Sequence, residues 1–175
     1  MRKKTLFIVQ AAIIAALYAS LTLGQMILLP GTADMAVQFR VSEALTILAL
    51  YTGAAIPGLT IGCVIGNILS GVGAVDMIFG PAASFFAVVA MYALRNVRVF
   101  KLPIPAALMP ALFNGLIVGF EIDFFFINNL SFNFTDFLIQ GGFVALGELA
   151  VLFVLGIPLS IMIEKTGLNK RVLNE

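Results

Sequence analysis

Histidine is absent from the 175-residue sequence, cysteine occurs once, and charged residues make up only 11% of it. Without histidine, the chain offers neither an imidazole ligand for a metal ion nor an imidazole proton relay. The single cysteine, Cys63, stands inside an apolar run and excludes a disulfide framework or a redox pair within the chain. The phosphate-binding pattern G-x-x-x-x-G-K-[ST] is also missing, so we expect no ATP site of the P-loop kind.

No nucleophile, base and orienting group stand at a recognisable spacing, so we expect neither an enzyme nor a cofactor in this chain. The net charge is only +1, which argues against nucleic acid as a partner. Apolar residues, by contrast, are abundant, at 61% of the chain with a mean hydropathy of +1.10. A soluble domain of this size could not bury so much apolar surface. The composition therefore predicts an integral membrane protein in contact with the lipid bilayer.

Nine of the ten basic residues lie in three short patches beside apolar runs. The patches are Arg2, Lys3 and Lys4; Arg95, Arg98 and Lys101; and Lys165, Lys170 and Arg171. Because Lys and Arg beside membrane spans stay on the cytoplasmic side, an even number of crossings must separate each patch from the next. The pattern predicts that the N and C termini and the 95–101 segment are all cytoplasmic.

This parity favours six transmembrane helices in a single all-α bundle over residues 1–175. The predicted spans are 6–29, 42–56, 58–72, 77–94, 104–127 and 136–163. The second and third are short and meet at Pro57 and Gly58, a pair that commonly marks a turn. As one kinked helix, residues 42–72 would instead place the 95–101 patch outside. The N-terminus also has features of a secretory signal, but its apolar run reaches Leu29 and exceeds the ~7–15 residues of a signal core.

Small residues recur at every fourth position on two of the predicted helices. The first carries Ala11, Ala15 and Ala19, with Ala12, Ala16 and Ser20 beside them, and the third carries Gly58, Gly62, Gly66 and Ser70. In lipid, helices associate through close backbone contact at such residues, because no hydrophobic force drives apolar helices together. We expect the glycine stripe to pack inside the bundle. For the alanine stripe, internal packing and docking to another membrane subunit both stay open.

A few polar residues lie in or near the predicted spans and are candidates for a substrate site. They are Gln38, Arg40, Glu43, Asn67, Asn114, Glu121, Gln140 and Glu148. A carboxylate near the centre of a span costs ~2.5–3.5 kcal/mol on insertion scales, so Glu121 and Glu148 need an explanation. One explanation is structural: a neutral carboxyl bonded to a neighbour, or a pair with Arg40. The other is a site open to the outside that accepts N–H groups from a ligand, with Asp34, Arg40 and Glu43 in the outer loop above it.

Phenylalanines gather around the predicted exterior loop at 128–136. They are Phe120, Phe124, Phe125, Phe126, Phe132, Phe134, Phe137 and Phe143. Most are expected to face lipid or core. A pocket that combines aromatic faces with carboxylates and amides nevertheless suits a small, planar, nitrogen-rich molecule.

Several segments together carry a resemblance to a known family. They are 38–45 (QFRVSEAL), 55–58 (AIPG) with 61–63 (IGC), 113–115 (FNG) with 119–121 (GFE), and 146–149 (LGEL). With the six short apolar helices, the basic N-terminus and the alanine stripe, they make the chain resemble the QueT family, among the substrate-binding (S) components of energy-coupling factor (ECF) transporters. The resemblance covers nearly the whole chain, and 38–45 is its most specific part.

The resemblance implies an importer of a queuosine precursor, a 7-deazaguanine such as queuine or its aminomethyl precursor, in a prokaryotic plasma membrane. Such a component captures substrate outside and docks, here through Ala11, Ala15 and Ala19, onto a membrane coupling (T) protein. Two ATPase subunits then supply the energy from ATP. With this substrate we expect Glu148 to bind the guanine-like edge, Glu121 the cationic amine and Asn114 the ring carbonyl.

Two rival functions stay open at the level of sequence. One is an S component for another planar vitamin or nucleobase, with the same fold and mechanism. The other is an ion-coupled transporter or small channel that works alone, in which Glu121 and Glu148 would be proton or sodium sites. Transport in vesicles without any ATPase would support the second.

Overall fold

A computed structural model describes residues 3–32, 37–70 and 73–169. Within these ranges the chain is helical and contains no β-strand beyond an isolated bridge between Val99 and Leu102. The helices are α1 (Lys3–Leu28), η1 (Val41–Leu50), α2 (Ala55–Ser70), α3 (Asp76–Ala93), α4 (Ile104–Ala107), α5 (Met109–Glu121), η2 (Ile122–Ile127), α6 (Phe134–Val151), η3 (Leu152–Gly156) and α7 (Ile157–Thr166).

Four helical segments are long and apolar enough to cross a membrane: α1, α3, the run Ile104–Ile127, and the run Phe134–Thr166. The last has 33 residues and reaches ~50 Å at ~1.5 Å per residue, more than the ~30 Å of a bilayer's hydrocarbon core. η1 and α2 are shorter apolar helices. The prediction of an all-α, multi-pass membrane protein is confirmed, while the count of six crossings stays a prediction.

The predicted turn at Pro57 and Gly58 is wrong. The chain turns instead at residues 51–54, between η1 and α2, and both residues lie in the first turn of α2. Proline is tolerated there because the first backbone N–H groups of a helix have no intrahelical partner. Gly58 serves packing: a Cβ at this position would lie 2.8 Å from the carbonyl oxygen of Ala11 on α1.

The glycine stripe of α2 packs against α1, as predicted. A Cβ on Gly62 would lie 2.9 Å from the carbonyl oxygen of Ala15, and one on Gly66 would lie 3.1 Å from Thr22. Ser70, the last member of the stripe, has a side chain outside the described part of the structure. Close backbone approach through glycine therefore joins α1 to α2.

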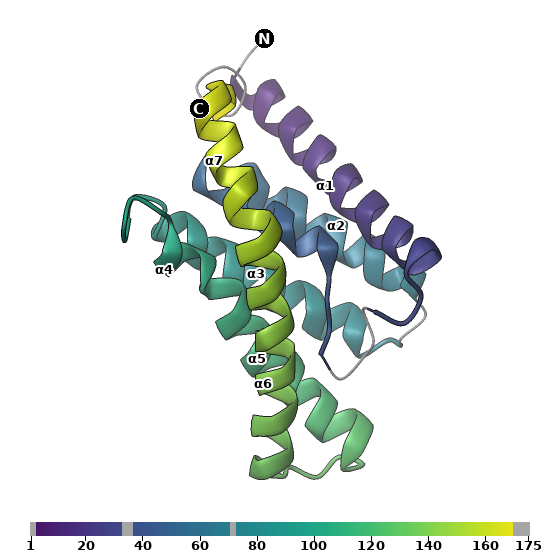
Figure 1. Ribbon diagram of the computed structural model, residues 1–175. Coiled ribbons are helices and arrows are strands. Elements are labelled where there is room, and N and C mark those ends of the chain that lie inside the picture. Colours follow the sequence, from purple (N-terminus) through teal and green to yellow (C-terminus); the bar gives the residue numbers. More distant parts are fainter. Residues whose placement is uncertain (1–2, 33–36, 71–72, 170–175) are drawn as a thin grey trace.

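Both ends of the described chain lie at one end of the molecule, and the turn between η2 and α6 lies at the other (Figure 1). Arg98 and Glu164 form an ion pair at 2.8 Å, which brings the second basic patch to the end of α7 beside Lys165. This arrangement agrees with the parity of the basic patches. Which end faces the cytoplasm stays a prediction, and Arg2, Asp34, Lys170 and Arg171 lie outside the described residues.

Candidate functional site

A row of polar side chains on α1 holds the segment that enters η1. Thr22 donates a hydrogen bond to the Ser42 hydroxyl at 2.9 Å. Gln25 donates to the Phe39 carbonyl oxygen and accepts from the Val41 backbone N–H at 2.8 Å. Tyr18, four residues before Thr22 on the same helix face, donates to the Glu43 carboxyl. The start of η1 is thus held against α1 at three successive points.

η1 runs for ten residues as a 3₁₀ helix, although such helices seldom exceed three or four. Glu43 lies in its first turn and is fully buried. Glu43 thus begins a buried helix, in agreement with the predicted span 42–56, and the contacts with α1 hold it inside the bundle. Its place at the outer mouth stays a prediction.

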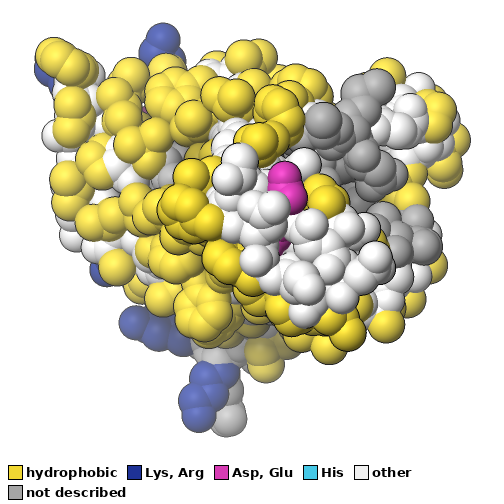
Figure 2. All heavy atoms as spheres, turned by 90° about the horizontal axis from the view of Figure 1, so that it is seen from below, with side chains coloured by type: hydrophobic (Ala, Val, Ile, Leu, Met, Phe, Trp, Pro, Cys, Tyr) yellow, Lys and Arg dark blue, Asp and Glu magenta, His cyan; other side chains and the backbone are white. Residues whose placement is uncertain are grey.

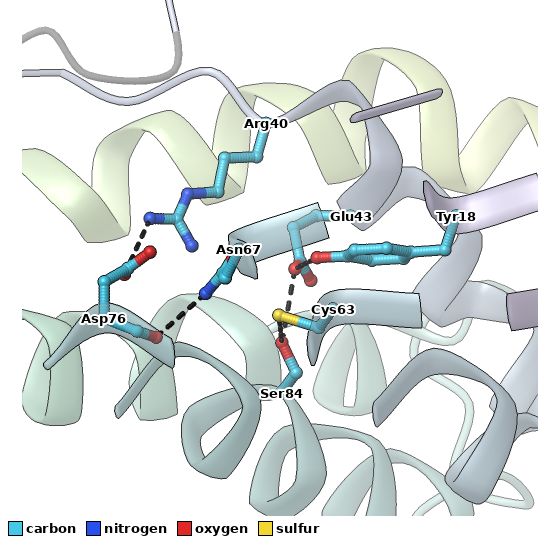
Figure 3. Close-up of polar contacts among 7 residues, drawn as sticks. All are labelled: Tyr18, Arg40, Glu43, Cys63, Asn67, Asp76 and Ser84. Atoms are coloured by element: carbon cyan, nitrogen blue, oxygen red, sulfur yellow. Dashed lines mark hydrogen bonds and ion pairs between the residues drawn. The ribbon is translucent and has the colours of Figure 1, made fainter. Parts of the chain in front are cut away.

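The Glu43 carboxyl is bonded on one side only (Figure 3). Its Oε1 accepts from the Tyr18 hydroxyl and lies 3.4 Å from the Ser84 hydroxyl of α3, which also lies 3.5 Å from the Cys63 sulfur. Its Oε2 is buried and has no hydrogen-bond partner among the described residues. One oxygen is held by the scaffold and the other is available.

Arg40 is the cation of this region. Its guanidinium lies 3.7 Å from the Asp76 carboxylate at the start of α3, and Asn67 of α2 donates to the Asp76 backbone carbonyl at 2.9 Å (Figure 3). Arg40 also interacts electrostatically with Glu121 and Glu148. The ion pair and the hydrogen bond join α2, α3 and the segment before η1, and the charge of Arg40 acts also on the carboxyls of α5 and α6.

Three further predicted residues are buried with unpaired polar atoms. Asn114, Glu121 and Glu148 are 1%, 1% and 2% exposed. Among the described residues, both side-chain atoms of Asn114, both carboxyl oxygens of Glu121 and Oε2 of Glu148 have no hydrogen-bond partner. A buried polar group without a partner costs ~1–3 kcal/mol, and native structures rarely keep several together without a ligand or water to bond them. This cluster therefore has the character of a binding site.

The contact between Gln38 and Gly147 brings the segment before η1 close to Glu148. The backbone of Gln38 packs directly on Gly147, and any Cβ there would collide with the Gln38 carbonyl group. The side-chain Oε1 of Gln38 is buried without a partner among the described residues. Seen from the end that carries the turn between η2 and α6, acidic side chains show among uncharged polar atoms on a face that is otherwise largely apolar (Figure 2).

Asp123 holds the turn that follows η2. This residue accepts hydrogen bonds from the Asn128 side chain at 2.6 Å and the Asn133 backbone at 3.1 Å. Phenylalanine rings gather beside the turn, as predicted: Phe120 stacks on Phe124 with centroids 5.3 Å apart. The aromatic cluster lies at the same end of the molecule as this turn.

The predicted site residues divide into two groups. Seven of them, Gln38, Arg40, Glu43, Asn67, Asn114, Glu121 and Glu148, either have buried unpaired atoms or interact directly around Asp76 and Arg40. Gln140 is half-buried on α6, one residue away from the buried face that includes Gly141 and Glu148. The sequence reasoning missed Tyr18 and Ser84, because each stands alone in an apolar helix and only the fold brings it to Glu43.

A separate apolar groove runs along the outside of α1 and α2. Its volume is ~520 Å³, and it is lined by Phe7, Ile8, Ala11, Ala12, Ala15, Ala16, Pro57, Ile61 and Ile65. Ala15 and Ala19 are only 7% exposed because they face α2, whereas Ala12 and Ala16 are exposed on the groove side. The docking role predicted for Ala11, Ala15 and Ala19 stays a prediction, and the exposed small residues are those of the neighbouring stripe.

A multi-pass helical bundle with buried, unpaired polar atoms is an arrangement typical of membrane transport proteins. The family described as "QueT transporter" matches residues 8–165. The chain is also 35% identical over 159 residues to a protein of Lactococcus lactis subsp. cremoris (strain MG1363) named "Queuosine precursor transporter QueT", covering 87% of this chain and 89% of that protein. No solved structure matches. This chain belongs to the QueT transporter family, which confirms the resemblance and implies a non-enzymatic role.

Proposed function

We propose that this protein is the substrate-capturing S component of an ECF-type importer, and that it binds a queuosine precursor of the 7-deazaguanine class. The observation that carries the proposal is the set of buried, unpaired polar atoms on Asn114, Glu121 and Glu148. The name of the Lactococcus lactis relative supports the substrate class. The absence of a P-loop pattern supports a division of labour in which partner subunits use the ATP.

The chemistry of the unpaired atoms matches the edge of a guanine-like ring. Such a ring presents adjacent N–H donors and a carbonyl acceptor in one plane. Glu148 is proposed to accept the paired N–H groups, Asn114 to bond the ring carbonyl, and Glu121 to face a cationic amine. A desolvated site strengthens each of these contacts because the local dielectric constant is low.

The remaining residues are proposed to complete the site. Arg40, held by Asp76, balances the negative charge of the carboxyls. Gln38 and Glu43 each present one unpaired oxygen to it, while Asn67 supports Asp76 and Gln140 lies at its edge. The phenylalanines beside the 128–133 turn offer faces against which a planar ring packs.

The coupling partners are proposed to be a membrane T protein and two ATPase subunits. The apolar groove on α1 and α2 is the surface that suits an apolar helix of the T protein, since Ala12 and Ala16 allow close backbone approach. Binding of substrate and docking to the partner would then use opposite faces of α1.

Two measurements test the proposal. Mass spectrometry of small molecules that copurify with the protein is expected to find a 7-deazaguanine, whereas a different planar vitamin or nucleobase would overturn the substrate class. Uptake of 7-aminomethyl-7-deazaguanine into vesicles is expected only when the T protein, both ATPases and ATP are present. ATP-independent uptake by this chain alone, driven by an ion gradient, would instead favour the ion-coupled transporter.

A further inference from the structure

We propose that Tyr18 is a positioning residue for the substrate: its hydroxyl fixes the orientation of the Glu43 carboxyl and thereby sets ligand affinity. The inference rests on the proposed function in taking a 7-deazaguanine as the ligand. Tyr18 is not expected to touch the ligand itself, since its hydroxyl is already bonded to Glu43.

The buried contact between Tyr18 and Glu43 involves only one of the two oxygens of the Glu43 carboxyl. Tyr18 is 2% exposed and Glu43 is fully buried, so water does not compete for the contact. Oε1 of Glu43 accepts from the Tyr18 hydroxyl and, at a longer distance, from the Ser84 hydroxyl. Oε2 is left without a partner among the described residues. The two donors therefore decide which carboxyl oxygen stays without a partner.

Arg40 is the competing partner for Glu43. It interacts electrostatically with Glu43, and its ion pair with Asp76 is long, at 3.7 Å. Without the Tyr18 hydroxyl, Oε1 of Glu43 keeps only the more distant Ser84 hydroxyl, at 3.4 Å, as a donor. The Tyr18 hydroxyl thus holds the Glu43 carboxyl in one orientation in a region that also contains a cation.

Tyr18 differs in this respect from the other polar residues on its helix face. Thr22 bonds the Ser42 hydroxyl, and Gln25 bonds the backbone of Phe39 and Val41. These two residues therefore hold the chain where it enters η1. Tyr18 alone among these three bonds a carboxyl group that has an unpaired buried oxygen. Its effect on the ligand should therefore pass through one carboxyl.

The test compares Tyr18→Phe with Tyr92→Phe in the purified full chain. Tyr92 packs its ring against Arg95, 4.0 Å from ring centroid to guanidinium carbon, away from Glu43. Calorimetry with 7-aminomethyl-7-deazaguanine is expected to show about tenfold weaker binding by Tyr18→Phe, the size expected when one buried hydrogen bond is lost, and unchanged binding by Tyr92→Phe. Thermal melts check that both variants remain folded.

A double-mutant cycle separates positioning from general support of the fold. If Tyr18 acts through Glu43, adding Tyr18→Phe to Glu43→Ala, which removes the acceptor of the Tyr18 hydroxyl, should weaken binding by less than twofold. Equal losses in both backgrounds, or unchanged binding by Tyr18→Phe, would overturn the inference while leaving the proposed function intact. Absence of binding by the unaltered protein would overturn the proposed function and this inference with it.

Discussion

At the residue scale, the chemistry of the site follows from which atoms the scaffold leaves unbonded. Asn114 leaves both a donor and an acceptor, whereas Glu121 and Glu148 leave acceptors when ionised. A ligand that satisfies them must present mostly N–H groups together with at least one acceptor. A guanine-like ring with an amino substituent meets this requirement, whereas a purely anionic molecule would meet repulsion.

Glu148→Gln should weaken binding of 7-aminomethyl-7-deazaguanine by well over tenfold. The substitution keeps the shape but replaces an acceptor with a donor, so a bidentate contact should lose on the order of 2–5 kcal/mol. Calorimetry on the purified protein measures the loss. Glu164→Gln is the matched control, because Glu164 pairs with Arg98 at the end of the molecule that carries the termini and should leave affinity unchanged. Near-normal binding by both Glu148→Gln and Glu121→Gln would show that these carboxyls are structural.

At the scale of elements, the candidate site lies where the 3₁₀ helix η1 and the segment before it are held between α1 and α6. Polar contacts from α1 hold one side, and direct backbone packing on Gly147 holds the other. A helix with this geometry is poorly stabilised by its own hydrogen bonds, so its neighbours decide its position. Substitutions in α1 or α6 should therefore alter ligand affinity even where the substituted residue does not contact the ligand.

Gly147→Ala should lower both ligand affinity and thermal stability. The added methyl group collides with the Gln38 backbone, and overpacking of this kind typically costs ~1–3 kcal/mol. Gly142→Ala, on the same helix, is the control: no atom lies within 4 Å of its added Cβ, and alanine favours a helix by up to ~1 kcal/mol. Equal melting temperatures and affinities for the two variants would contradict the contact between Gln38 and Gly147.

Ala16→Trp should abolish uptake while leaving substrate binding unchanged. Ala16 is exposed and lines the apolar groove, so a bulky ring blocks close approach of a partner helix there. Ile13→Trp, at an exposed position that does not line the groove, should leave uptake intact.

Ala15→Trp should instead reduce stability and binding together, because Ala15 is only 7% exposed and packs against α2. Uptake assays in vesicles beside calorimetry decide the matter, and normal uptake by Ala16→Trp would remove the groove as a docking surface.

At the scale of the whole molecule, the positions of the basic patches and of the 128–133 turn predict one orientation in the membrane, with the termini on the cytoplasmic side. The Arg98–Glu164 pair gathers the second basic patch and the end of α7, and the 128–133 turn lies at the opposite end. Because basic residues beside spans stay cytoplasmic, the 128–133 turn should face outward. A substrate would then enter from outside.

Cysteine labelling tests this orientation. On a background in which Cys63 is replaced, an impermeant reagent added outside should modify a cysteine at position 131 and should not modify one at position 98. Ser131 is exposed in the outer turn, and Arg98 lies at the predicted cytoplasmic end. The control is permeabilised cells, in which both positions should react. Labelling of position 98 in intact cells would exclude the six-crossing topology.

Sequence by itself determined the class of this protein and which residues are candidates for its site. Apolar runs of membrane length leave few alternatives to helices, because each backbone group in lipid must find a partner within its own segment. In such a chain a buried carboxyl or amide is conspicuous, and Asn114, Glu121 and Glu148 stand out for that reason. The family also follows from segments that are contiguous in the chain.

Only the tertiary structure decided how these residues meet. The turn at residues 51–54, the burial of Glu43 and its bond to Tyr18 depend on contacts between positions 25 or more residues apart, which no local pattern encodes. Pro57 and Gly58 have the local chemistry of a turn, but packing on α1 makes them the start of a helix. Likewise, the two small-residue stripes of α1 cannot be told apart in the sequence. One is buried because α2 packs against it, and the other stays exposed. Burial depends on which elements pack against a residue, and only the tertiary structure decides that.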